Sequence, residues 1–191
     1  MFRELVLRNR SYRRFQEAER IEASVLEELV DLARQTPSAS NLQPLKYIIS
    51  SGMEKNATIF STLTWAAKLP WNGPVEGERP AAYIIILEDK ELSGFAAYDC
   101  GIAAQTILLG AVEKALGGCM LGAIKREKLR AELNIPENLD ILLVIALGKP
   151  AENVVIENLP SNGDTSYWRD ENDIHHAPKR NLKDIIIGQY H

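Results

Sequence analysis

The sequence predicts an α/β or α+β fold with a small sheet and with helices that hold most of the mass. Three observations predict it. Helix-like and strand-like apolar segments alternate along the chain, the strand-like segments are few and short, and one apolar segment is long enough to cross a whole domain. The 191 residues suffice for one sizeable hydrophobic core, so we expect a single domain over residues 1–191.

The helices are predicted from apolar residues at helical spacing. Ile21–Arg34 carries such a face and ends before Thr36-Pro37, because proline disfavours a helical residue before it. The longest, Leu92–Leu116, is apolar nearly all round from Phe95 on, so we expect a buried central helix that Gly117-Gly118 ends. Shorter helices are expected over Phe2–Leu7, Asn56–Leu63 and Lys125–Leu133, and a short helix or strand over Leu182–Ile187.

The strands are predicted from short runs of β-branched and other apolar residues. Leu45–Ser50 (LKYIIS) is one, and Ala81–Leu87 (AAYIIIL) and Asp140–Leu147 (DILLVIAL) show no polar alternation, which is typical of buried strands. Pro70–Pro80 is rich in turn formers and is expected to be a loop. Residues 151–178 are polar and are expected to be irregular.

Composition excludes several classes of function. A net charge of -4 argues against a nucleic-acid partner, which would need a surplus of Lys and Arg. The longest uncharged stretch, Cys100 to Val112, is too short to span a bilayer, and Phe2-Arg3-Glu4 puts charges where a signal peptide needs apolar residues. The two cysteines form no C-x-x-C pair, so we expect reduced thiols and a cytoplasmic protein without a membrane partner.

The first polar cluster, residues 9–15 (NRSYRRF), suits a phosphate. Arg10, Arg13 and Arg14 offer guanidinium donors, and Ser11 offers a hydroxyl next to a predicted helix end. The alternative is a solvated basic turn, because charge runs are commonly exposed.

The second polar cluster, residues 37–44 (PSASNLQP), suits a planar polar heterocycle. Asn41 and Gln43 both donate and accept hydrogen bonds, as the edge of a flavin or pteridine requires. Pro37 and Pro44 would hold these amides in place. The alternative is an ordinary connection between a helix and a strand.

Two further segments carry weaker signals. Glycines around Cys119 in residues 117–122 (GGCMLG) would let backbone approach a flat ligand, although they also suit a helix end and a tight turn. No His lies near Cys119 in sequence, so no nucleophilic thiol is expected. Lys179 and Arg180 could close on the same phosphate or could be surface charge. His175-His176 lacks a third ligand at useful spacing, so no metal site is expected.

Taken together and in order, these segments resemble a known family. NRSYRRF resembles the nitroreductase-like, FMN-dependent flavoprotein signature Arg-Arg-Ser-x-Arg-x-Phe, and PSASNLQP resembles its Pro-Ser-x-x-Asn-x-Gln-Pro. The long apolar helix leading into ALGGCMLG, a strand ending in ALGKP, and the terminal PKR follow the same order. The resemblance covers nearly the whole chain.

The resemblance implies an α+β fold, a small central sheet flanked by helices, a long buried central helix, and an intertwined homodimer with two FMN sites at its interface. It places Pro37, Ser38, Ser40, Asn41 and Gln43 against the flavin from the partner subunit. It implies that the phosphate and ribityl chain are bound by Arg10, Ser11, Arg13, Lys179 and Arg180, and that the isoalloxazine lies along Cys119, Met120, Leu121 and Gly122. One position departs from the signature, since Asn9 stands where its first Arg is expected, and Arg8 or Arg10 would have to substitute.

The function implied is hydride transfer from NADH or NADPH through flavin N5 to a nitroaromatic, a quinone or a similar small-molecule acceptor, by a ping-pong mechanism. The chemistry belongs to the cofactor, so no side chain is assigned a catalytic role. Two alternatives stay open: the same flavin with other chemistry, namely dehalogenation, ene reduction or flavin fragmentation, and a non-catalytic FMN-binding dimer. Trp65, Trp71 and Trp168 could line the acceptor pocket, although at least two are expected simply to pack.

Overall fold

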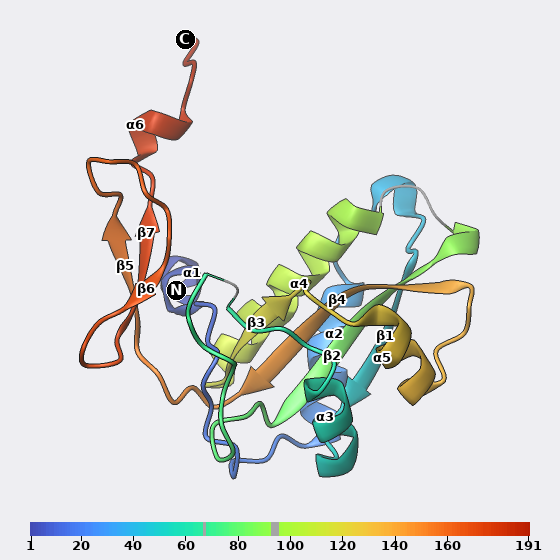
Figure 1. The fold of residues 1–191 in the computed structure, drawn as a ribbon. Helices are drawn as coiled ribbons and strands as arrows, with labels where there is room; N and C mark the ends of the chain where they lie inside the picture. Colours follow the sequence, from blue (N-terminus) through green and yellow to red (C-terminus); the bar gives the residue numbers. More distant parts are fainter. Residues whose placement is uncertain (67, 93–95) are drawn as a thin grey trace.

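The main body is a four-stranded antiparallel sheet with helices on both faces (Figure 1), seen in a computed structural model that describes residues 1–66, 68–92 and 96–191. The strand order is β1-β2-β4-β3. This confirms the α+β prediction and the small sheet flanked by helices.

The strands are β1 (Leu45–Ser50), β2 (Ala82–Asp89), β3 (Gly117–Leu121) and β4 (Leu139–Gly148). The helices are α1 (Phe2–Arg8), α2 (Ala23–Arg34), α3 (Met53–Phe60), α4 (Ala96–Glu113), α5 (Arg126–Leu133) and α6 (Leu182–Ile185), with short 3-10 turns η1 (Ala39–Asn41) and η2 (Lys90–Leu92).

The two middle strands, β2 and β4, are covered on both faces. Ile84 and Ile86 of β2 pack under α2 and α4, whereas Tyr83 and Ile85 face α3 and α5. Successive side chains of a strand point to opposite faces, and here both faces are core. This explains why β2 and β4 lack polar alternation although the sheet is antiparallel.

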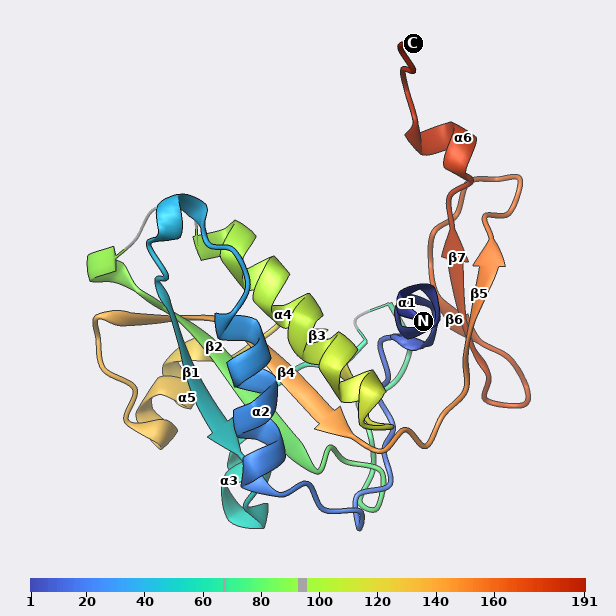
Figure 2. The ribbon, with the colours of Figure 1, turned by 180° about the vertical axis from the view of Figure 1, so that it is seen from behind.

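α4 lies along one face of the sheet beside α2 (Figure 2). Its inner face is made of small and aliphatic residues, such as Ala104, Ile107 and Ala111, which let it lie close to its neighbours. The predicted central helix is therefore present, but in one copy its outer face is open, with Tyr98 71% and Ile102 42% exposed. Its predicted first turn, residues 93–95, lies outside the described residues. Among the described helices none has both the length and the apolar character needed to cross a membrane.

The end of α4 differs from the prediction. The chain turns at Ala115, whose φ is 59°, and Gly117-Gly118 do not cap the helix but open β3. Glycine is required there because a Cβ on Gly118 would overlap the Ala146 carbonyl oxygen and lie 2.7 Å from a Leu108 methyl. These two glycines serve close strand packing rather than helix termination.

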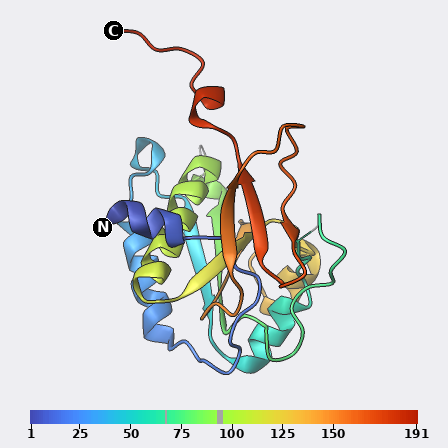
Figure 3. The same ribbon diagram turned by 90° about the vertical axis from the view of Figure 1, so that its left-hand side faces the viewer.

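The C-terminal arm, residues 154–191, stands away from the main body in Figure 1, and Figure 3 shows its strands in front of the body with the tail extending beyond it. It contains a second sheet of order β5-β7-β6, in which β5 and β7 are parallel and β6 and β7 are antiparallel. The prediction of irregular structure over residues 151–178 is therefore wrong, because these short, half-exposed strands carry no sustained apolar pattern. The strands are β5 (Val154–Asn158), β6 (Trp168–Arg169) and β7 (His175–Lys179).

We expect Gly118→Ala to lower the free energy of unfolding by about 1–3 kcal/mol, since the added methyl overpacks the junction of β3, β4 and α4. Urea unfolding at fixed protomer concentration measures it. Gly52→Ala is the matched control, because nothing lies within 4 Å of a Cβ there. Equal stability of the two variants would contradict the packing argument.

Candidate functional site

The two polar clusters lie at opposite ends of α4. Ser11 forms a bridge with Gly118, and the Tyr12 amide donates to the Gly118 carbonyl at 3.0 Å, which places residues 9–15 beside β3, after the end of α4. At the start of α4, Asp99 Oδ1 accepts a hydrogen bond from the Ala39 amide at 3.1 Å. The helix between Asp99 and Glu113 spans about 20 Å at about 1.5 Å per residue. One copy of the chain therefore does not bring the two clusters together.

Asp99 anchors the amide loop, residues 37–44, by hydrogen bonds. The Ser38 hydroxyl donates to Asp99 Oδ2 and accepts from the Gln43 amide at 2.9 Å. Ser40, Asn41 and Gln43 adopt φ values of 51°, 54° and 52°, a left-handed conformation that non-glycine residues rarely adopt. The side chains predicted to bind, Pro37, Ser40, Asn41 and Gln43, are exposed, and Ser38 is half-buried.

Sequence reasoning missed Asp99. It is 5% exposed and is the one charged residue between Ala96 and Val112. A lone carboxylate in an apolar helix must find hydrogen-bond donors when it is buried. That rule was the available signal for a loop anchored on α4.

Arg14 is neutralised within the chain. Its guanidinium lies 3.3 Å from both Glu78 and Asp173 and is 19% exposed. For Arg10 and Arg13, by contrast, no carboxylate partner is found in the part of the chain that the structure describes. The cluster thus contains one arginine that is paired within the chain and two arginines that have no acid partner among the described residues.

Arg10 and Arg13 instead donate to nearby backbone. Arg10 Nη2 lies 2.6 Å from the Val6 carbonyl oxygen, while Arg13 Nη1 lies 3.1 Å from that of Ser11. Arg13 also lies over the Tyr167 ring, 4.9 Å from its centroid, and burial lowers the pKa of the Arg10 guanidinium. Two guanidiniums beside a hydroxyl and without acid partners are suited to bind an anion.

The outer edge of β3 is open next to this cluster. Met120 is 38% exposed and Gly122 is exposed, whereas Cys119 and Leu121 turn their side chains into the core. Alternate residues of a strand direct their backbone N–H and C=O groups to the same side. The backbone groups of Met120 therefore face the same edge as the Gly118 carbonyl that binds Tyr12. Burial raises the pKa of the Cys119 thiol to about 11, which agrees with the expectation of no nucleophilic cysteine.

The cations of the C-terminal arm do not join Arg13 within one copy. Tyr167, which Arg13 covers, stacks on His175 at the start of β7 with ring centroids 5.3 Å apart. Lys179 ends β7, about 13 Å further along at about 3.3 Å per residue. Lys179 and Arg180 are both exposed there. The predicted convergence of both chain ends on one anion is not formed by a single chain, because β7 is extended and leads away.

The root of the arm is a buried polar node that sequence reasoning also missed. The Glu152 side chain is 2% exposed, binds Arg169 at 3.0 Å, and accepts from the backbone amides of Arg13 and Arg14. This carboxylate ties the arm to the first polar cluster. Its surrounding sequence, Ala151-Glu152-Asn153, carries no pattern that predicts it.

The adjacent histidines of β7 have different ring partners, since His175 stacks on Tyr167 and His176 on Trp168. Burial lowers the pKa of His175 to about 4. Desolvation lowers the pKa of His176 as well, but hydrogen bonds to Glu157 and Asp170 outweigh it and raise this pKa overall. Within the described ranges no three His, Cys, Asp or Glu side chains are grouped to hold a metal ion.

Trp65 and Trp71 pack within one copy of the chain, whereas Trp168 is 45% exposed. Trp65 is 4% exposed and lies against Phe60, and Trp168 stacks on His176 at 3.9 Å. Trp71 is covered by Arg14 and Arg169, the latter 4.3 Å from its ring centroid. The expectation that at least two of them pack is confirmed.

The chain belongs to the nitroreductase family, whose model matches residues 6–149. A protein of Methanothermobacter thermautotrophicus named "Putative NADH dehydrogenase/NAD(P)H nitroreductase" is 30% identical over 156 residues, which cover 78% of each chain.

Two solved structures show the same fold. One, from Bacteroides thetaiotaomicron and of the same name, has a TM-score of 0.70 at 22% identity and covers 99% of this chain and 98% of its own. The other, an FMN-dependent nitroreductase of Clostridium difficile R20291, has a TM-score of 0.64 at 23% identity and covers 78% of this chain and 87% of its own.

If Asp99 fixes the amide loop, Ser38→Ala and Asp99→Ala should be coupled. We expect each to lower the free energy of unfolding, and the double variant to lose about 1–2 kcal/mol less than the sum, because the second change has no hydrogen bond left to break. Urea unfolding at fixed protomer concentration measures the cycle.

Ser61→Ala combined with Asp99→Ala is the control, since the Ser61 hydroxyl donates to the Thr58 carbonyl and accepts from Lys128 Nζ, neither of which belongs to the amide loop or to α4. That pair should be additive. Additivity of the Ser38 pair as well would show that Asp99 does not hold the loop.

Proposed function

We propose that the protein is an FMN-dependent oxidoreductase that takes hydride from NADH or NADPH and reduces a nitroaromatic, a quinone or a similar acceptor. One observation carries the proposal: the bridge between Ser11 and Gly118 holds two guanidiniums, which have no acid partner among the described residues, beside an open strand edge. The printed names of the relatives, which include an FMN-dependent nitroreductase and an NAD(P)H nitroreductase, support the cofactor and the electron donor.

The residues present fit FMN. Arg10, Ser11 and Arg13 would hold its phosphate and ribityl chain, and the Met120–Gly122 edge would lie along its ring. When bound, FMN supplies the redox chemistry, accepting hydride from the nicotinamide and delivering it to the acceptor in alternate half-reactions of a ping-pong cycle.

The chain itself binds and orients. The guanidiniums neutralise the phosphate, and the left-handed amide loop holds Asn41 and Gln43 ready for a ring edge that alternates carbonyl and N–H groups. A loop fixed before binding loses less entropy when the ligand arrives. We assign no general acid or base among the side chains.

We further propose that the site is completed in a homodimer. The amide loop and the first cluster sit at opposite ends of α4, so two copies related by a two-fold axis, with antiparallel α4 helices, would bring the loop of one to the cluster of the other. The arm supports this, since α6 and the tail expose a set of large apolar residues that the chain's own body does not cover. They are Leu182, Ile185, Ile186, Ile187 and Tyr190.

The protein purified with FMN should be yellow, and NADH or NADPH should bleach it under anaerobic conditions. Arg13→Gln should weaken FMN binding about 10- to 100-fold through loss of a charge-assisted contact. Fluorescence titration of the apoprotein with FMN measures it. Arg14→Gln is the matched control, because Arg14 is already paired with Glu78 and Asp173. A colourless protein that ignores added FMN would end the proposal.

Light scattering should give a mass twice the 21.3 kDa of the chain. Ile102→Asp, on the open face of α4, should shift the mass toward the monomer and weaken FMN binding at the same time. Val75→Asp, at an apolar position in the loop before β2 that is 63% exposed against 42% for Ile102, should leave both unchanged. A wild-type mass of one chain at micromolar concentration would sink the dimer.

A further inference from the structure

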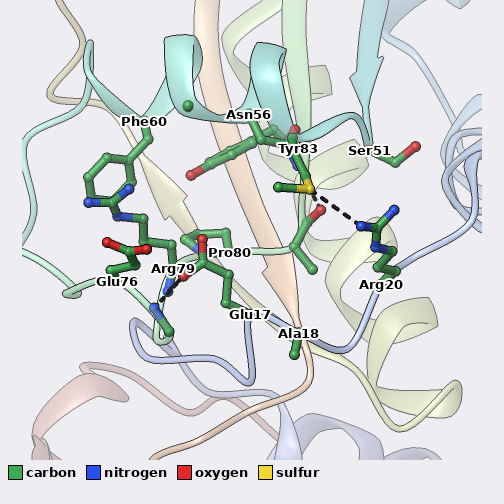
Figure 4. Close-up of a pocket in the computed structure, with 14 residues that line it drawn as sticks. Glu17, Ala18, Arg20, Ser51, Asn56, Phe60, Glu76, Arg79, Pro80 and Tyr83 are labelled. Atoms are coloured by element: carbon green, nitrogen blue, oxygen red, sulfur yellow. Dashed lines mark hydrogen bonds between the residues drawn. The ribbon is translucent and has the colours of Figure 1, made fainter.

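A cavity of about 580 Å³ lies at the edge of the sheet under α3 (Figure 4). Its walls come from α3, from residues 17–20 and from residues 76–83. None of them belongs to the two polar clusters, to β3 or to the arm, so the cavity is separate from the proposed FMN site. Its volume is in the range of pockets that hold small organic ligands.

Tyr83 and Arg79 line this cavity, and each carries a buried donor that has no hydrogen-bond partner among the described residues. Tyr83 is 1% exposed, its hydroxyl has no hydrogen-bond partner, and its ring extends toward Phe60 and Arg79 (Figure 4). Burial raises the pKa of Tyr83, so the hydroxyl keeps its proton. Arg79 Nε is likewise buried without a partner, and the guanidinium lies 4.9 Å from the Phe60 centroid.

Arg20 lies on the opposite wall with a weak partner. Its Nη2 donates to the Met53 thioether sulfur at 3.4 Å. No ion pair joins Arg20 or Arg79 to a carboxylate in residues 1–66, 68–92 and 96–191. A thioether is a poor acceptor, so this guanidinium also retains donor capacity.

Two acceptors around the cavity are, in contrast, already engaged. Glu17 Oε2 accepts from the Gly77 amide at 2.5 Å and from the Arg79 amide at 3.3 Å. Asn56 Oδ1 accepts from the Ser50 hydroxyl at 2.7 Å, and the Asn56 amide nitrogen donates to the Ala81 carbonyl. Glu76 stands exposed at the rim, where water solvates it.

We infer that this cavity binds a small organic anion, a carboxylate carried on an aromatic or other apolar body. The unused capacity consists of donors, two of them cationic, so the complementary ligand is an acceptor with negative charge. The Phe60 ring, Met53, Ala57 and Pro80 give the cavity an apolar wall for the body of such a ligand. The carboxylate would bind the donors of Arg79 and Tyr83.

The test is a titration of the isotope-labelled, FMN-loaded full chain with benzoate and with phenylacetate, followed by backbone amide shifts. We expect saturable shifts at Ala57, Gly77 and Arg79. Benzamide, the neutral isostere of benzoate, should bind at least about tenfold more weakly than benzoate. Shifts confined to residues near β3 would report binding at the proposed FMN site instead and would overturn the inference. The absence of shifts with both acids would overturn it as well, and so would benzamide binding as tightly as benzoate.

Two variants localise the site. Arg79→Gln should weaken benzoate binding at these amides about tenfold, and Tyr83→Phe about threefold. Arg34→Gln is the control, since Arg34 is exposed on α2 and paired with Asp31. Unchanged affinity in both cavity variants would reject the assignment.

Thermal unfolding separates a binding role of Tyr83 from a structural one. Without benzoate, Tyr83→Phe should melt at the wild-type temperature or above it, because the hydroxyl has no hydrogen bond to lose. With benzoate, the variant should show a smaller rise in Tm than the wild type. A variant that melts lower and still binds benzoate normally would make the hydroxyl structural and remove it from the site.

Discussion

The packing of α4 against the sheet and α2 is the constraint on which the rest of the structure depends. Its small inner residues, such as Ala104 and Ala111, fix the helix close to the sheet. One end then presents Asp99 to the amide loop, and the other leads into β3 and its bridge to Ser11. A rigid helix keeps these two half-sites about 20 Å apart. A site that needs both halves must therefore take them from two copies, which is the physical basis of the proposed dimer.

Three carboxylates, the buried Asp99 and Glu152 and the half-buried Glu17, anchor loops in the same way. Asp99 accepts from the amide loop, Glu152 from the amides of Arg13 and Arg14, and Glu17 from the amides of Gly77 and Arg79. Hydrogen bonds from backbone N–H to a carboxylate are stronger than neutral ones, and in a buried place their loss leaves a charge without partners. Acids that need not touch a ligand thus fix, through hydrogen bonds to backbone amides, the loops that carry exposed binding groups.

The sequence predicted those parts of the fold that local pattern determines. β1 has the predicted bounds, and β2, β4 and α5 differ by one or two residues at their ends, because their apolar runs or helical spacing reflect burial directly. The strands of the arm escaped prediction because their partners are short, polar and distant in sequence. The left-handed backbone at Ser40, Asn41 and Gln43 also depends on a distant contact, the one with Asp99.

The same distinction separates the cations. Arg10, Arg13 and Arg14 are indistinguishable in sequence, and only the fold brings Glu78 and Asp173 to Arg14 and leaves the other two without acids. Donors left without acceptors cost stability, so a fold retains them where something other than stability is selected. In the described part of the chain, guanidiniums without an acid partner flank the edge of β3, with Arg10 and Arg13, and the cavity under α3, with Arg20 and Arg79, where the Tyr83 hydroxyl also lacks a partner. Glu17 binds the loop that lines the cavity, and it follows closely in sequence after the cluster beside β3. One continuous stretch of backbone therefore positions the donors of both places.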